Sequence, residues 1–187
     1  SHLTPDPMKL NPIKRLRVPG EGMLVGTDMY GRDVFARTLH GSRISLLVGL
    51  SAAAVSTLFG LTIGLMAGYN RLFDTIVMRF MDGIMAIPSI LLAIALVSLT
   101  GASVGIVIVA ISIPEIPRVV RLVRSVVLTI REQPYIEAAI SVGARLPKIL
   151  LRHILPNTLA PLIVQATYVC ASAMITEAIL SFLGAGT

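Results

Sequence analysis

The sequence has little of what a water-soluble domain needs at its surface. Only 14% of its 187 residues are charged, whereas a soluble domain typically has about 25%. The single cysteine, Cys170, has no partner for a disulfide within the chain. There is no tryptophan, and five phenylalanines and four tyrosines offer few platforms for stacking nucleic-acid bases. These shortages exclude a disulfide-stabilised scaffold and argue against a soluble or nucleic-acid-binding protein, despite a net charge of +6.

Apolar residues make up 55% of the chain and gather in long segments. A helix needs about 20 residues to cross a bilayer. Residues 44–69 carry no charge, residues 83–113 carry none and are long enough for two helices, and residues 158–183 are interrupted only by Glu177. We therefore expect an all-α, polytopic transmembrane helical bundle. Its four expected spans cover about 44–69, 83–100, 101–117 and 158–183, with the second and third separated at turn-forming residues.

The charges around these spans suggest an orientation. Residues 70–82 and 118–157 share one face and hold nine basic residues, against seven in residues 1–43. The positive-inside rule therefore favours a cytoplasmic loop 118–157 and an extracytoplasmic segment 1–43. In the outer segment we expect an interfacial amphipathic helix from Tyr30 to His40, capped by Thr27 or Asp28.

Two patterns within the spans predict how the helices pack. Gly60, Gly64 and Gly68 form a small-xxx-small stripe, which predicts a close helix–helix seam. In the last span, one helical face carries four polar residues, namely Gln165, Tyr168, Ser172 and Thr176. Such a stripe does not face lipid, so it either makes interhelical hydrogen bonds or borders a substrate path. For Glu177 we favour a buried, hydrogen-bonding carboxylate over a proton carrier.

The central loop carries two predicted helices that are too short to span. The first lies within residues 131–143, because Pro134 suits a first helical position and Gly143 a helix end. The second begins at Pro147 and ends before Pro156. Small residues on the first helix, Ala138 and Ala139 among them, would let a partner approach closely.

This loop resembles the EAA loop of permease subunits in bacterial binding-protein-dependent ABC importers. The matching residues are Glu137, Ala138, Ala139, Gly143, Leu155 and Pro156. The variant of this motif with a histidine two residues before the Leu-Pro pair, here His153, resembles the oligopeptide, dipeptide and nickel permease branch of that family. Residues 26–37, 78–82 with Pro88, and 181–184 resemble other segments of the same branch, so the resemblance covers about residues 24–186.

The resemblance implies a type I ABC importer permease fold with six spans, of which four are present. It also implies a bacterial inner-membrane protein that pairs with a second permease, two cytoplasmic ATPases and an extracytoplasmic solute-binding protein. By position, Glu137, Ala138, Ala139 and Gly143 would form the ATPase-coupling helix, while His153, Leu155 and Pro156 would hold the return into the last span. Substrates of that branch include peptides, nickel and other small solutes, and which one this chain transports stays open.

No residue pattern predicts chemistry in the chain itself. The lysines lack a phosphate-binding glycine-rich context and the three histidines lack metal-ligand spacing, so we expect no enzyme activity, no metal and no bound cofactor. ATP and Mg²⁺ would bind to the partner ATPases. The alternatives are a secondary transporter or channel, a non-transporting membrane scaffold, and, given the missing spans, a truncated piece or an inactive permease.

Overall fold

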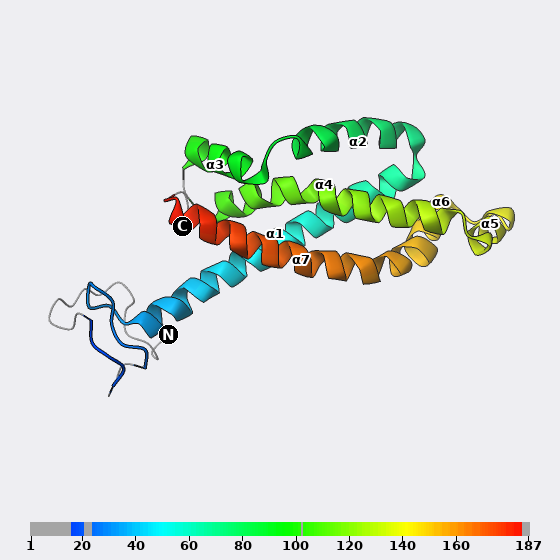
Figure 1. Ribbon diagram of the computed structural model, residues 1–187. Helices are drawn as coiled ribbons and strands as arrows, with labels where there is room; N and C mark the ends of the chain where they lie inside the picture. The colour runs from blue at the N-terminus through cyan, green and yellow to red at the C-terminus, as the bar shows by residue number, and fades with distance from the viewer. Residues whose placement is uncertain (1–15, 21–23, 102, 185–187) are drawn as a thin grey trace. The chain divides into compact units, whose positions relative to one another are not determined.

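The computed structural model describes residues 16–20, 24–101 and 103–184. Their regular structure is helical apart from isolated β-bridge residues, such as the pair Thr27 and Asp33 (Figure 1). The chain divides into two compact units, residues 1–47 and 48–187. The predicted all-α class is therefore confirmed for the described residues.

A turn around Asp28 organises the first unit. The Oδ1 atom of Asp28 accepts the backbone N–H groups of Arg32 (2.9 Å) and Tyr30 (2.8 Å), and Arg37 Nη1 lies 2.7 Å from Oδ2. The bond from the Arg32 N–H, with those from Tyr30 and Arg37, lowers the pKa of Asp28 below its usual value, although partial desolvation opposes the shift. The turn thus carries an ionised carboxylate at neutral pH.

Helix α1 (Val34–Tyr69) follows this turn without interruption. The prediction of a separate helix from Tyr30 to His40 is wrong, and so is the predicted cap. The carboxylate of Asp33, not of Asp28, accepts the N–H of Phe35 at the helix start (2.9 Å). No proline lies between His40 and residue 44 to end the helix. The expected amphipathic helix and the first apolar span therefore belong to one continuous helix.

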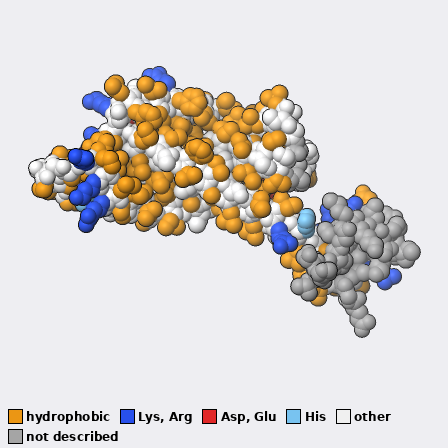
Figure 2. Space-filling view, turned by 180° about the vertical axis from the view of Figure 1, so that it is seen from behind, with side chains coloured by type: hydrophobic (Ala, Val, Ile, Leu, Met, Phe, Trp, Pro, Cys, Tyr) orange, Lys and Arg blue, Asp and Glu red, His pale blue; other side chains and the backbone are white. Residues whose placement is uncertain are grey.

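The second unit contains the other helices. In chain order they are α2 (Arg71–Met85), α3 (Ser89–Thr100), α4 (Val104–Arg131), α5 (Pro134–Ser141), α6 (Leu146–Ile149), the π-helix η2 (Leu150–Ile154) and α7 (Leu155–Phe182). Helix α4 is central, because α2, α3 and α7 all pack against it. Hydrophobic side chains are spread over the face seen in Figure 2, and Lys and Arg side chains gather at the end where α5 and α6 lie.

The polypeptide bends sharply between α2 and α3. We expected one helix over residues 83–100, but α2 ends at Met85 and α3 begins at Ser89, with 82° between them. Pro88 explains the break, because its ring lacks an N–H donor and disfavours the α conformation of Ile87. Helix α3 alone has only 12 residues, about 18 Å at 1.5 Å per residue, which is shorter than a bilayer core.

Helix α4 is longer than expected and continues through two prolines. It was predicted to stop at residue 117, yet it runs from Val104 to Arg131 with Pro114 and Pro117 inside. Each proline removes one intrahelical hydrogen bond. The burial of Val119, Val120, Val123 and Val127, all 0% exposed, offsets that loss through apolar packing.

The second loop helix also continues where an end was predicted. Instead of stopping before Pro156, α6 passes through the π-helix into α7. The Leu155 N–H bonds to the carbonyl of Leu150, five residues back. This wider turn accommodates Pro156, whose ring would crowd the carbonyl four residues back in a regular α-helix.

Two continuous helical segments within the described residues are long and apolar enough to cross a membrane, Val34–Tyr69 and Leu146–Phe182. The bent pair of α2 and α3 gives a third if it acts as one span. Helix α4 has the length but carries Glu115, Arg118 and further arginines. The assignment of four spans therefore stays a prediction.

Candidate functional site

The short helix α5 is defined at both ends by its own sequence. Pro134 occupies the first turn, where its missing N–H costs nothing. At the other end, Gly143 adopts φ +82°. The Gly143 N–H bonds to the carbonyl of Ile140 (2.8 Å) and the Ala144 N–H to that of Ala139 (3.0 Å), which is the Schellman arrangement. Gly143 is therefore needed for its backbone conformation.

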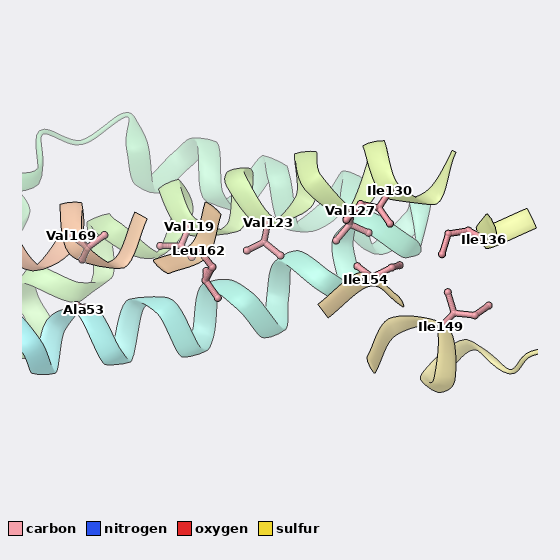
Figure 3. Packing of buried hydrophobic residues seen from close by; sticks show 10 residues of the cluster. All are labelled: Ala53, Val119, Val123, Val127, Ile130, Ile136, Ile149, Ile154, Leu162 and Val169. Carbon is pink, nitrogen blue, oxygen red and sulfur yellow. The ribbon is translucent and has the colours of Figure 1, made fainter. Parts of the chain in front are cut away.

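One buried side chain anchors α5. Ile136 is 0% exposed and belongs to the same apolar cluster as Ile130 of α4, Ile149 of α6 and Ile154 of η2 (Figure 3). The cluster continues along α4 and α7. The role of Ile136 was not predicted, because α5 holds two isoleucines, Ile136 and Ile140, and its eight residues do not show which one is buried. The anchor makes α5 a fixed projection of the bundle.

The rest of α5 faces outward. Glu137, Ala138 and Gly143 are exposed and Ala139 is half-buried. Next to them, Ile140 is 50% exposed and Val142 88% exposed. Apolar side chains gathered around small residues give a surface that a partner's backbone could approach closely.

The predicted return residues lie directly behind α5. The ring of His153 is half-buried, and its centroid lies 6.3 Å from that of Tyr135 in α5. Leu155 is half-buried and Pro156 is exposed. The Thr158 hydroxyl, fully buried, donates to the carbonyl of Ile154 (2.8 Å). The structure thus brings the two halves of the expected coupling loop together.

The three glycines of α1 lie against three valines of α4. A Cβ atom added to Gly60, Gly64 or Gly68 would lie 2.4, 2.7 or 2.6 Å from the Cβ of Val119, Val123 or Val127, respectively. Two backbones can approach this closely only where one side lacks a Cβ. At the end of the seam, Arg131 Nη1 donates to the carbonyls of Gly68 and Tyr69, both at 3.3 Å. The seam therefore joins α1 to the part of α4 that leads into α5.

Ion pairs fasten α2 to α4. Arg124 binds Asp74 through two nitrogens, and its Nη2 lies 2.6 Å from Oδ2. A second pair joins the same helices nearer the end of α2, where Arg121 Nη2 lies 2.5 Å from Asp82 Oδ1. The first pair is mostly shielded, with side chains 31% and 16% exposed, and the second is open, with 45% and 56%.

The predicted polar stripe of α7 reaches a charged pair on α4. Gln165, Ser172 and Thr176 are half-buried, while Tyr168 is 56% exposed. The Ser172 hydroxyl lies 3.5 Å from Glu115 Oε1, which also accepts from Arg118 Nη1 at 2.7 Å. Glu177, one position off the stripe, is 5% exposed. Arg118 was missed because the third span was expected to end at residue 117, and Glu115 because it was expected at that end of the span.

A groove of about 310 Å³ opens where α2 bends into α3. Its walls are formed by Met85, Ile87, Pro88, Ser89, Ile90, Pro114 and Arg118. Within the described residues, no group of three or more His, Cys, Asp or Glu side chains is placed to hold a metal ion.

Comparison with known proteins gives consistent matches. Residues 60–187 match the family described as "Binding-protein-dependent transport system inner membrane component". A probable peptide ABC transporter permease of Sinorhizobium fredii is 61% identical over 181 residues, covering 97% of this chain and 62% of the relative. A dipeptide transport system permease of Alkalihalophilus pseudofirmus is 46% identical over 177 residues, covering 94% and 58%. A putative peptide transport system permease of Brucella suis is 47% identical over 173 residues, covering 92% and 58%. The chain thus spans less than two thirds of the length of these relatives.

Proposed function

The chain belongs to the family of binding-protein-dependent transport system inner membrane components, and from that premise we propose that it serves as a permease subunit of an ATP-driven importer in the bacterial inner membrane. It pairs with a second permease subunit, receives solute from an extracytoplasmic binding protein and is driven by two cytoplasmic ATPases. The ATPases bind and hydrolyse ATP with Mg²⁺, and this chain changes conformation in response and forms part of the solute path.

The observation that carries this proposal is the construction of α5. Its outer face is exposed and lined with small and apolar side chains, while Ile136 fixes its inner face to the cluster shared with α4 and α7. A partner that grips α5 therefore moves the bundle, because protein interiors are close-packed and transmit displacement. When the ATPases close, the grooves that hold the coupling helices would carry α5 along.

The motion has a defined route through the second unit. Arg131 connects the end of α4 to the end of α1, and the glycine–valine seam keeps those helices together. Ile154 and Thr158 connect the same cluster to the start of α7. Displacement of α5 thus reaches α1, α4 and the polar stripe of α7 as one body, which suits a rocking change between inward- and outward-facing states.

For the solute we propose short peptides. The relatives at 46–61% identity carry peptide or dipeptide permease names. The stripe of Gln165, Tyr168, Ser172 and Thr176 supplies hydroxyl and amide groups along α7, as a path for a peptide backbone requires. Nickel fits less well, since the described residues offer no cluster of three metal-ligating side chains.

The test is uptake by the assembled importer. The permease pair, ATPases and binding protein, reconstituted into liposomes, should accumulate labelled dipeptide only with ATP. Glu137→Arg should abolish uptake by disrupting the face of α5. Glu132→Arg, at an exposed position just outside α5, should preserve most of it. Uptake driven by an ion gradient without ATPases would favour a secondary transporter and refute the proposal. Binding of the ATPases without any ATP-dependent uptake would indicate a scaffold and refute it too.

A further inference from the structure

The groove at the bend between α2 and α3 has a charged side chain, Arg118, in its wall. A second groove, between the ends of α3 and α4, is lined by apolar residues, glycine and two hydroxyls, as a lipid-facing surface would be. At the bend, Arg118 stands among Met85, Ile87 and Ile90. Its side chain remains 38% exposed.

Arg118 lies near the middle of α4, 14 residues after its first residue, Val104. In a spanning helix an arginine at such a depth does not face lipid, since the transfer costs at least about 2.5 kcal/mol. It faces a partner or a path that contains water. Arg118 lines the groove and is 38% exposed there, so among the described residues the groove is where such a path or partner would meet it.

The guanidinium of Arg118 is only partly used. Nη1 donates to Glu115 Oε1 at 2.7 Å, and this is the one hydrogen bond that Arg118 makes among the described residues. Arginine has five N–H donors in a rigid fork. The bond to Glu115 holds the side chain in place through Nη1. The Nε–Nη2 edge makes no hydrogen bond among the described residues, and such an edge can bind a carboxylate through two parallel hydrogen bonds.

We propose that Arg118 and the groove at the α2–α3 bend bind the C-terminal carboxylate of a peptide in transit, a role that rests on the proposed peptide-importer function. The site favours a ligand group with one negative charge over one with two. Glu115, which is 4% exposed, already neutralises part of the charge of Arg118 and would repel a dianion. The apolar walls of Met85, Ile87 and Ile90 accept an aliphatic C-terminal side chain. The volume of about 310 Å³ lies at the lower end of the range for ligand clefts, about 300–1,000 Å³.

The direct test is chemical modification in the permease–ATPase complex held in lipid nanodiscs, without the binding protein. Phenylglyoxal modifies accessible arginines, and mass spectrometry follows Arg118 and Arg79 separately. Arg79, exposed on α2, is the internal control. The probes are alanyl-leucine and its C-terminal amide. With alanyl-leucine at about ten times its dissociation constant, mass action should slow the modification of Arg118 about elevenfold, and leave that of Arg79 unchanged.

Three results would overturn the proposal: an Arg118 that is unreactive without peptide, equal protection by the amide, or no protection by either probe. Transport by the complete importer adds a second readout. Arg118→Gln should raise the KM for alanyl-leucine about tenfold or more, as loss of a charged hydrogen-bond pair predicts, while Arg79→Gln should leave it unchanged. If the wild-type importer takes up no peptide, the proposed function fails. If it takes up peptide while Arg118 is not protected, this inference alone fails.

Discussion

Gly60 of α1 lies so close to Val119 of α4 that a Cβ atom on the glycine would be 2.4 Å from the Cβ of the valine. The contact involves the branch point of a fully buried valine, which has no flexible end to move aside. Gly64 and Gly68 repeat the relationship with Val123 and Val127. The seam is therefore intolerant of even a single methyl group.

Gly60→Ala should accordingly destabilise the protein. Overpacking of a close-packed interior costs about 1–3 kcal/mol, which outweighs the gain of about 0.5–1 kcal/mol from replacing a helical glycine by alanine. Gly83→Ala in α2, where a Cβ would meet nothing within 4 Å, should stabilise or be neutral. Thermal unfolding of the purified protein in detergent measures both. Val119→Gly removes the Cβ that the new methyl group would meet, so Gly60→Ala should cost less in the Val119→Gly background, and an equal cost in both backgrounds would show that the seam is not the cause.

A second prediction concerns the anchor of α5. Ile136→Ala leaves a cavity in a cluster where Ile149 and Ile154 are at most 1% exposed, and such changes cost about 2–5 kcal/mol. Because α5 is short, we expect the loss as local loosening rather than as global unfolding. Hydrogen exchange of the backbone amides of α5 should rise strongly. Ile140→Ala, at a half-exposed position on the same helix, is the matched control and should change exchange little.

A third prediction tests whether Gly143 is needed for its backbone conformation or for its lack of a side chain. A Cβ there meets nothing within 4 Å, yet φ is +82°, a conformation that costs an ordinary residue about 1–2 kcal/mol. Gly143→Ala should therefore loosen the end of α5 by that amount, and Gly143→Asn by less, since asparagine tolerates this conformation. Hydrogen exchange at Gly143 and Ala144 measures the difference. Equal effects of alanine and asparagine on exchange would show that the left-handed backbone conformation is not what makes glycine necessary here.

The sequence predicted the ends of α5 because they rest on local chemistry, a proline at the start and a glycine at the end. It failed where tertiary packing outweighs local preference. Pro114 and Pro117 favoured an end to α4, but the seam with α1 lies just beyond them and holds the helix together. That error also hid Arg118, which was assigned to a cytoplasmic loop. Ile136 was missed because small residues drew attention and burial is not visible in eight residues of sequence.

The ion pairs between α2 and α4 give the last prediction, because they share chemistry but differ in burial. Asp74 and Arg124 are shielded and joined by two contacts, so Asp74→Asn should cost about 1.5–3 kcal/mol, as for a hydrogen bond to a charged group. Asp82 and Arg121 are about half exposed, and Asp82→Asn should cost at most about 1 kcal/mol. Double-mutant cycles with Arg124→Gln and Arg121→Gln, followed by thermal unfolding, isolate each pair. Raising the salt concentration should weaken the Asp82 pair more than the Asp74 pair, since exposed charges are screened more strongly. Equal coupling energies for the two pairs would show that shielding does not set their strength.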